Sequence, residues 1–397
     1  TTPEPRAIAE AAALIAGAKR PLFYTGGGVI NAGPKASTAL RELARMTGAP
    51  VASTLMGLGA FPADDPAWLG MVGMHGTFEA NHAMHDCDVM IAVGARFDDR
   101  VTGRLDAFSP GSKKIHIDID PSSIGKVVRA DVRVLADAGE ALAALIQALK
   151  RERLVAERLQ PWWKQIEGWR ARRCLTYRPS TDVIKPQHAI ERLFALTRGR
   201  DVYITSEVGQ HQMWAAQYFG FNEPNRWMTS GGLGTMGYGL PAAVGVQTAH
   251  PKALVIDIAG DASVQMTMQE MATAIQHDLP IKVFILNNEW MGMVRQWQQL
   301  LHGERYSHSY SASLPDFVKL AEAFGAVGLR ASHPDELDGL IEEMIDTPLP
   351  VIFDCRVERA ENCFPMIPSG KAHNEMLLGD DAADLGGAVD DAGRRLV

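Results

Sequence analysis

The sequence predicts an α/β protein with two doubly wound parallel-sheet domains. Short apolar runs alternate with helical patterns in two separate blocks of the 397-residue chain, which is typical of parallel sheets covered by helices on both faces. Several of these runs end at Gly, Asp or Asn, the residue types found where open parallel sheets bind ligands. Hydrophobic residues make up 46% and charged residues 22%, the balance of a globular protein with two or three domains.

The first block, residues 1–150, is expected to be one doubly wound domain. A helix over residues 1–20 leads straight into a strand and a glycine loop. Strands are expected at Pro21–Thr25, Val51–Thr54, Asp88–Val93 and Ile115–Ile119. Helical patterns alternate with them, including Pro34–Met46 and Glu79–His85. This alternation predicts helices on both faces of the sheet.

A charged helical segment, residues 151–184, is expected to connect the first block to the second. Its basic cluster at 170–173 indicates a solvated helix face rather than an anion site. The second α/β block covers residues 185–360, and residues 361–397 are expected to form an irregular tail. Strands of the second block are expected at Asp201–Thr205, Ala253–Ala259, Ile281–Leu286 and Val351–Cys355.

Charge and composition exclude several classes of protein. The formal net charge is -8 and the pI is about 5.9, so the surface favours neither nucleic acid nor an anionic membrane. No apolar run reaches the roughly 20 residues of a membrane-spanning helix, and no signal peptide is visible. The four cysteines form no Cys-x-x-Cys pair, which favours a reducing, cytoplasmic setting. They are Cys87, Cys174, Cys355 and Cys363.

The sharpest chemical signal is a pair of polar motifs that follow two strands of the second block. The strand over 254–258 leads to Gly260-Asp261-Ala262-Ser263, a helix is expected over about 267–276, and the strand over 281–286 ends at Asn287-Asn288. Both strand ends lie at the same edge of a parallel sheet. Asp261 and Asn288 therefore bring a carboxylate and an amide oxygen together, as Mg²⁺ prefers. Either half alone favours a helix cap or a turn.

The combination of Gly-Asp, about two dozen residues and Asn-Asn resembles the cofactor motif of thiamine-diphosphate (ThDP) enzymes, with Ala-Ser in place of the usual glycine. Other segments of the sequence narrow the resemblance to one family of ThDP enzymes. They are 73–77, 94–103, 208–214, 230–237 and 287–297. Together they resemble the catalytic large subunit of acetohydroxyacid synthase, also called acetolactate synthase, from the first glycine loop to about residue 370.

The resemblance implies roles around ThDP. Mg²⁺ takes the side chains of Asp261 and Asn288 and the backbone carbonyl of Trp290. Met236 is the bulky residue under the cofactor that forces its V shape, although its position alone favours core packing. The Gly234 carbonyl accepts a hydrogen bond from the 4′-amino group. The diphosphate is held by backbone N–H groups and short side chains of Val208, Gly209, Gln210, His211, Ala262 and Ser263.

The family joins two 2-ketoacids with loss of CO₂, giving 2-acetolactate from two pyruvates or 2-aceto-2-hydroxybutyrate from pyruvate and 2-ketobutyrate, in branched-chain amino-acid biosynthesis. Arg100 matches a clamp for the second ketoacid's carboxylate, and an ion pair with Asp98 or Asp99 is its alternative. Trp297 matches the position that favours the ethyl ketoacid, a preference worth about 1–3 kcal/mol per methylene. Met293 and Val294 line the same channel.

The first domain resembles the family's FAD-binding domain, in which FAD has no redox role in the net reaction. Gly26-Gly27-Gly28 alone is a weak nucleotide signal. Asp118, Ile119 and Asp137 are expected near the ribose and adenine. The remaining candidates are Thr54, Leu55, Met56, Met74, His75, Gly94, Ala95, Arg96, Asp98, Arg100 and Val101.

The sequence departs from the family in one respect. The acid–base glutamate of these enzymes lies in an N-terminal pyrimidine-binding domain, and no acidic residue of this chain matches its motif. The chain is therefore expected to lack that domain and to be inactive by itself. Expected partners are 2-ketoacid substrates, a second copy in a homodimer or homotetramer, and a small regulatory subunit. Alternatives are another ThDP enzyme of the pyruvate oxidase or 2-ketoacid decarboxylase type, and a non-catalytic FAD- or nucleotide-binding fragment.

Overall fold

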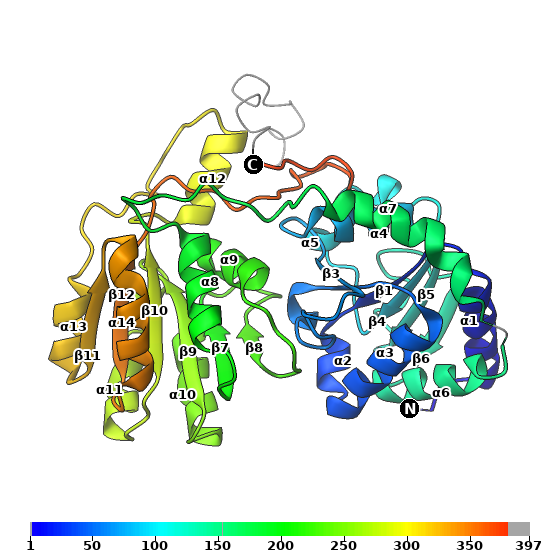
Figure 1. Cartoon of the computed structure of the whole chain (residues 1–397), viewed down its shortest axis with the longest axis horizontal. Helices are drawn as coiled ribbons and strands as arrows, with labels where there is room; N and C mark the ends of the chain where they lie inside the picture. Colours follow the sequence, from blue (N-terminus) through cyan, green and yellow to red (C-terminus); the bar gives the residue numbers. More distant parts are fainter. Residues whose placement is uncertain (1, 153, 380–397) are drawn as a thin grey trace. The chain divides into compact units, whose positions relative to one another are not determined.

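The chain forms two compact units, each built around its own parallel sheet (Figure 1). A computed structural model describes residues 2–152 and 154–379. Unit 1 contains the described residues up to Leu175, then Gly220–Asn225, and the segment that starts at Phe364. Unit 2 contains Thr176–Phe219 and Arg226–Cys363. Both units thus have the predicted fold class, α/β with an all-parallel sheet.

Unit 1 contains a six-stranded parallel sheet in the order β3-β2-β1-β4-β5-β6. The strands are β1 (Pro21–Thr25), β2 (Val51–Ser53), β3 (Trp68–Met71), β4 (Val89–Val93), β5 (Lys113–Asp118) and β6 (Val132–Leu135). The helices are α1 (Pro5–Gly17), α2 (Gly27–Asn31), α3 (Pro34–Thr47), α4 (Phe78–Asp86), α5 (Asp99–Thr102), α6 (Ala138–Leu149) and α7 (Gln160–Arg170). Short 3₁₀ turns occur at Leu55–Gly57, Leu105–Ala107 and Ala156–Leu159.

Successive residues of the unit 1 strands point to opposite faces, and each face has its own core. Phe23 and Ile91 pack with α1, α3 and α6, whereas Leu22 and Met90 pack with α4 and α7. Alternate strand residues must point to opposite faces, so a strand covered on both sides becomes a continuous apolar run. The arrangement is the doubly wound one that the sequence predicts.

The segment 151–184, expected as a connecting helix, is helical over α7 and contributes to unit 1 up to Leu175. Trp162 of α7 is 1% exposed, and its indole N–H donates to the Pro21 carbonyl at 3.1 Å. Arg170 donates to the carbonyls of Pro66 and Trp68, at 2.8 Å each. This helix is thus packed onto the sheet on one side.

Unit 2 contains the second six-stranded parallel sheet, in the order β11-β12-β10-β9-β7-β8. The strands are β7 (Val202–Ser206), β8 (Trp227–Thr229), β9 (Leu254–Gly260), β10 (Lys282–Asn287), β11 (Val327–Ala331) and β12 (Val351–Arg356). The helices are α8 (Pro186–Leu196), α9 (Gln210–Tyr218), α10 (Gly239–Ala249), α11 (Glu270–Gln276), α12 (Gly292–Leu301), α13 (Phe317–Phe324) and α14 (Pro334–Asp346). One 3₁₀ turn occurs at Val264–Met266.

The expected helix over about 267–276 is shorter than predicted, because the chain after β9 first forms the 3₁₀ turn and enters α11 only at Glu270. The helices α10, α11 and α13 cover one face of this sheet. On the other, α8 packs against α9 and α14, and α9 packs on β9. Figure 1 shows the resulting layers. No helix in the described part of the chain is long and apolar enough to cross a membrane.

The expected tail, residues 361–397, is anchored where it is described. In unit 2, the carbonyls of Glu361 and Cys363 accept hydrogen bonds from the side chains of Gln210 and Gln296. In unit 1, Met366 forms a β-bridge with Leu377. His373 is 1% exposed, and its imidazole Nε2 contacts the Val101 carbonyl. The part of the predicted tail from 380 to 397 lies outside the described residues.

Candidate cofactor site

The two predicted metal ligands of unit 2 follow neighbouring parallel strands. In the pairing of β9 with β10, Gly260 lies opposite Leu286, so Asp261 and Asn288 leave the sheet at the same edge. The backbone N–H of Asn288 donates to the Asp261 carboxylate. The βαβ unit therefore brings together the two side chains that the sequence selects, at the carboxyl ends of the strands.

The Asp261 side chain is buried and only partly satisfied. It is 1% exposed, and its Oδ2 has no hydrogen-bond partner among the described residues. Burial raises its pKa to about 7, helped by the charges of Asp354 and Glu289 and opposed by backbone N–H donors. A buried carboxylate oxygen without a donor is costly unless a cation meets it. The geometry fits a hard divalent ion.

The Asn287–Trp290 turn is held from both sides. Asn287 Nδ2 donates to the buried Asp354 Oδ1 at 2.8 Å, so this first asparagine anchors the loop to β12. Asn288 Oδ1 accepts the Trp290 N–H at 3.2 Å. Glu289, at a φ of 64°, is paired by Arg356 and Arg359 and accepts the Tyr310 hydroxyl. The charged network outside the turn fixes the position of Asn288.

The predicted diphosphate residues converge on the same edge. Asn288 Nδ2 donates to Gln210 Oε1 at 3.2 Å. The His211 ring lies between two glycines, because a Cβ placed at Gly209 or at Gly260 would lie 2.6 Å from a ring atom. A side chain at Gly260 would therefore overlap this imidazole. Burial lowers the His211 pKa to about 3, so the ring is neutral at physiological pH.

Two further predicted residues lie on the turn after β9. Ser263 is buried, and its hydroxyl accepts the Gly260 N–H at 3.0 Å and donates to the Gly260 carbonyl at 3.2 Å. Ala262 is half-buried beside it. Ser263 thus closes the turn that follows β9.

The loop before α10 contains the two residues predicted to touch the ThDP rings. Gly234 is exposed with a φ of 66°, and a Cβ there would lie 3.9 Å from Val208 Cγ1. Met236 is half-buried. The loop thus lies beside the first residue of the predicted diphosphate cradle.

The substrate-channel candidates lie on α12. Met293 and Trp297 are half-buried and Val294 is 47% exposed. Gln296 holds the segment after β12, since its Oε1 accepts the Cys363 N–H at 2.8 Å and its Nε2 donates to the Cys363 carbonyl at 3.2 Å. Gln210 Nε2 also donates to Gln296 Oε1, at 2.9 Å. The sequence did not single out this role for Gln296.

Sequence reasoning also missed Glu207, a fully buried carboxylate directly before Val208. The available signal was an acidic residue immediately after an apolar strand, at the ligand-binding edge. Among the described residues, no group of three or more His, Cys, Asp or Glu side chains could hold a metal ion.

In unit 1, the glycine loops predicted to bind a nucleotide pack on one another. A Cβ at Gly26 would lie 2.2 Å from the Gly94 carbonyl oxygen, and a Cβ at Gly28 would lie 2.5 Å from Gly94 Cα. Gly27 lies over Met56, which is 41% exposed, with Thr54 and Leu55 preceding it after β2. Glycine is therefore needed here for the chain crossing itself, beside any ligand role.

The Ala95–Val101 segment contains the predicted Arg96, Asp98 and Arg100. Arg96 pairs with Asp98 at 2.5 Å, and Asp98 Oδ1 accepts the Arg100 N–H at 3.1 Å. The Arg100 side chain is exposed. Ala95 and Val101 are buried, Met74 N–H donates to the Arg100 carbonyl at 2.8 Å, and His75 contacts the Pro365 carbonyl.

The residues predicted near ribose and adenine also follow adjacent strands. Asp118 ends β5 and accepts the Asp120 N–H at 2.9 Å, and Ile119 is 59% exposed beyond it. Asp137 follows β6 and caps α6 through Gly139 N–H at 2.8 Å. The Asp137 carboxylate is thus occupied as a helix cap. The exposed Ile119 side chain offers an apolar face for a ring.

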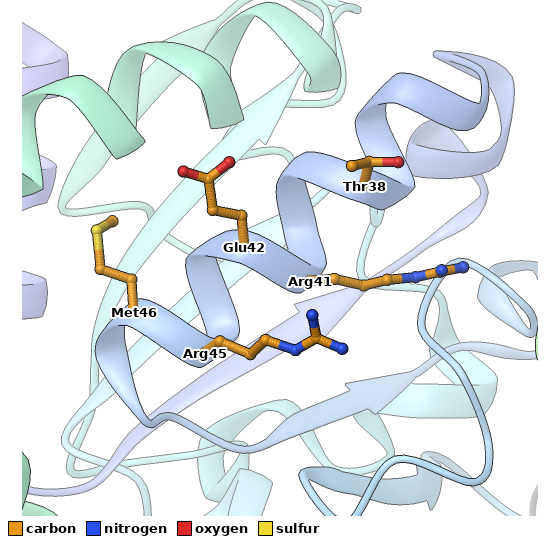
Figure 2. A pocket seen from close by; sticks show the side chains of 5 residues that line it. All are labelled: Thr38, Arg41, Glu42, Arg45 and Met46. Carbon is orange, nitrogen blue, oxygen red and sulfur yellow. The ribbon is translucent and has the colours of Figure 1, made fainter.

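A separate pocket lies on the exposed side of α3 (Figure 2). Arg41 donates to the Asn222 carbonyl at 3.3 Å, and Glu42 pairs with Lys150 at 3.6 Å. None of the predicted site residues lines this pocket, which is formed by Thr38, Arg41, Glu42, Arg45 and Met46.

Comparison with known proteins agrees with the geometry. The family described as "Thiamine pyrophosphate enzyme, C-terminal TPP binding domain" matches residues 207–355, and "Thiamine pyrophosphate enzyme, central domain" matches residues 8–145. The chain is similar to the acetolactate synthase isozyme 3 large subunit of Escherichia coli, with 48% identity over 383 residues. This alignment covers 95% of the chain and 66% of that relative.

The acetolactate synthase large subunit of Haemophilus influenzae is 45% identical over 363 residues, which cover 91% of the chain and 63% of that relative. The large subunit of Parasynechococcus marenigrum is 46% identical over 379 residues, which cover 94% and 60%. The chain therefore spans less than two thirds of the length of these relatives. It belongs to the thiamine pyrophosphate enzymes, as a homologue of acetolactate synthase large subunits that contains their central and C-terminal domains.

Proposed function

We propose that this chain supplies the cofactor-binding part of an acetolactate synthase, which joins two 2-ketoacids with loss of CO₂ in branched-chain amino-acid biosynthesis. The observation that carries the proposal is the juxtaposition of Asp261 and Asn288 at the ends of β9 and β10, with Gln210 in contact with Asn288. The names of the relatives, acetolactate synthase large subunits, support the reaction.

Three oxygen ligands would hold Mg²⁺ with the ThDP diphosphate: the side chains of Asp261 and Asn288 and the Trp290 carbonyl. The unpartnered Oδ2 of Asp261 supports this assignment, since Mg²⁺ takes few protein ligands and completes its shell with phosphate oxygens and water. Backbone N–H groups around the open turn suit a phosphate. These are contributed by Val208, Gly209, Gln210, His211, Ala262 and Ser263.

Bound ThDP supplies an electron sink that lets a 2-ketoacid lose CO₂. Gly234 and Met236 orient its rings in our proposal, and Met293, Val294 and Trp297 shape the apolar space for the ketoacid side chain. The exposed guanidinium of Arg100 would bind a ketoacid carboxylate through two parallel hydrogen bonds. One additional methylene in such a space changes the preference by about 1–3 kcal/mol.

Unit 1 is proposed to bind FAD at the carboxyl edge of its sheet. The Gly26–Gly28 loop, the Asp118 carboxylate and the exposed Ile119 lie at this edge. A glycine loop suits the diphosphate of a dinucleotide, a carboxylate suits the ribose hydroxyls, and an apolar side chain suits a ring. The flavin is proposed to be structural.

Partners and setting are also proposals. The words "large subunit" in the relatives' names support a small regulatory partner, and a homodimer or homotetramer is proposed for the assembly. All four cysteines are free thiols, which supports a reducing cytoplasmic setting.

The proposal is tested by isothermal titration calorimetry, in which the 397-residue chain is titrated with ThDP in the presence and absence of Mg²⁺. We expect saturable binding that requires Mg²⁺ and is lost in Asp261→Asn. Absence of Mg²⁺-dependent binding would refute the cofactor assignment.

Turnover is tested with pyruvate and 2-ketobutyrate, alone and after addition of the N-terminal part of the relatives that this chain does not span. We expect acetohydroxyacids only in the second case. Acetaldehyde or acetate as the main product would favour a decarboxylase or oxidase instead.

A further inference from the structure

The buried Glu207 carboxylate contacts the loop that leads into α10. Its Oε2 accepts the Gly237 N–H at 2.5 Å, and its Oε1 accepts those of Gly239 at 3.0 Å and Leu240 at 3.2 Å. The Tyr238 N–H also donates to it. One carboxylate thus receives four consecutive backbone N–H groups.

These N–H groups belong to the start of a helix, where no intrahelical acceptor is available. Usually the side chain of the N-cap residue accepts one of them, but Tyr238 at the N-cap of α10 makes no such bond. Glu207 supplies the acceptor from the end of β7, about thirty residues earlier in the chain. Its negative charge also suits the positive end of the helix.

Asp257 of β9 lies against the same turn. A Cβ at Gly239 would lie 2.1 Å from Asp257 Oδ1 and 2.7 Å from the Glu207 nitrogen, so β7, β9 and α10 meet with no room for a side chain. Asp257 is fully buried and receives the Thr205 hydroxyl at 3.1 Å, whereas its Oδ2 has no hydrogen-bond partner in the described chain.

Glu207 and Asp257 are two buried carboxyl groups beside the same turn. Burial raises the pKa of both, and the neighbouring Glu207 raises that of Asp257 further. N–H donors favour the charged form of the carboxylate that receives them. Glu207 receives four N–H groups and Asp257 one hydroxyl, so the ionised form is favoured more strongly at Glu207 than at Asp257.

We propose that Glu207 is a positioning residue that couples the two ThDP-binding segments of this site. It directly precedes the cradle residues 208–211, and it holds the end of the loop 230–237 that contains Gly234 and Met236. This inference rests on the proposed function for what the two segments bind. The contacts that carry it do not depend on that function.

The test compares Glu207→Gln with the matched variant Asp257→Asn in the full chain, by hydrogen exchange of residues 230–240 without cofactor and by Mg²⁺–ThDP titration. A glutamine keeps one acceptor oxygen, so we expect exchange at 237–240 to rise about tenfold and the ThDP dissociation constant to rise by a similar factor. Asp257→Asn keeps the oxygen that Thr205 contacts, so we expect less than about threefold in either measurement.

Wild-type protection at 237–240 in Glu207→Gln would overturn the proposal, as would a larger effect of Asp257→Asn. Equal loss of protection in β9 and β10 would also overturn it, because Glu207 would then be a general core residue. If Glu207→Gln does not fold, Glu207→Asp, which draws the carboxylate back by one methylene, is measured instead. Faster exchange at 237–240 than in wild type supports the proposal, and exchange that rises no more there than in β9 and β10 overturns it. Failure of the wild type to bind ThDP refutes the proposed function and leaves the exchange comparison valid.

Discussion

At the residue scale, the proposed Mg²⁺ ligand Asp261 is a buried carboxyl group whose charged form is costly without a cation. Its pKa rises to about 7 because burial disfavours the charged form. A metal ion binds only the deprotonated carboxylate. Below about pH 7, Mg²⁺ must therefore displace a proton, and its apparent affinity should fall as the pH is lowered.

Asp261→Asn is expected to stabilise the empty chain at pH 8 while abolishing Mg²⁺-dependent ThDP binding. The folded state of the wild type binds a proton between about pH 4 and pH 7 that the unfolded state has released, so its stability falls as the pH rises through that window. The stability difference between variant and wild type should grow to on the order of 2–4 kcal/mol by pH 8. Urea unfolding at pH 4, 6 and 8 measures it, and a pH-independent difference would contradict the assigned pKa.

Gly260→Ala is expected to destabilise unit 2 by about 1–3 kcal/mol, because its Cβ would overlap the His211 ring. Gly245→Ala in α10 is the matched control, since nothing lies within 4 Å of a Cβ there. That change should stabilise the helix by about 0.5–1 kcal/mol.

Adding His211→Ala to Gly260→Ala tests the cause. Removal of the ring leaves Ser263 Oγ, at 3.4 Å, as the nearest neighbour of the new methyl group. The double variant should therefore lose less stability than the sum of the single variants. Strict additivity in the thermal or urea unfolding data would show that the ring does not cause the loss.

At the element scale, sequence reasoning found the central strands and missed the edges. The eight expected strands correspond to β1, β2, β4, β5, β7, β9, β10 and β12, which are the inner four of each sheet. The missed strands β3, β6, β8 and β11 are the four edges. Inner strands are buried on both faces and form continuous apolar runs. Val132–Leu135 instead alternates buried with exposed residues, and Trp227–Thr229 is only three residues long.

The same division holds within the site. Asp261 and Asn288 could be predicted because each directly follows an inner strand, and the right-handed βαβ connection brings those ends together. Glu207 also directly follows an inner strand, so the sequence could indicate its place at this edge but not its partners. The partners of Glu207 and Gln296 are backbone groups about thirty and sixty-seven residues away. Which backbone N–H lacks an acceptor depends on where α10 and the segment 361–363 pack, and no local pattern in the sequence reports that.

Gln296→Ala is expected to release the segment at Glu361–Cys363 from α12. The variant loses both hydrogen bonds to the Cys363 backbone and the contact to Gln210, which corresponds to about 1–3 kcal/mol for buried groups. Hydrogen exchange at Cys363 should accelerate accordingly. Gln276→Ala, at an exposed position of α11, is the matched control and should leave exchange unchanged. Equal exchange in the two variants would contradict this role of Gln296.

At the scale of the whole molecule, each unit is discontinuous in the chain. Residues 220–225 and the segment from Phe364 belong to unit 1 although unit 2 lies between them in the sequence. Asn222 accepts a hydrogen bond from Arg41, and Ile367 N–H donates to the Met74 carbonyl at 2.8 Å. Dividing the sequence by composition gives only consecutive blocks. It cannot detect that these two segments pack back onto unit 1, because each contacts that unit through only a few residues without regular secondary structure.

The two separate cores lead to a prediction about ligand-dependent stability. Because each unit has its own sheet and hydrophobic core, a ligand should stabilise only the unit that binds it, by about 2.7 kcal/mol at a hundred times its dissociation constant. Hydrogen exchange of core strands reports each unit separately: Mg²⁺–ThDP should slow exchange in β9 and β10, and FAD should slow it in β1 and β4. In Asp261→Asn the first effect should vanish and the second persist, since the substitution removes a proposed metal ligand of unit 2 only. Slowing of both cores by either ligand alone would show that the units unfold as one, and would refute independent binding.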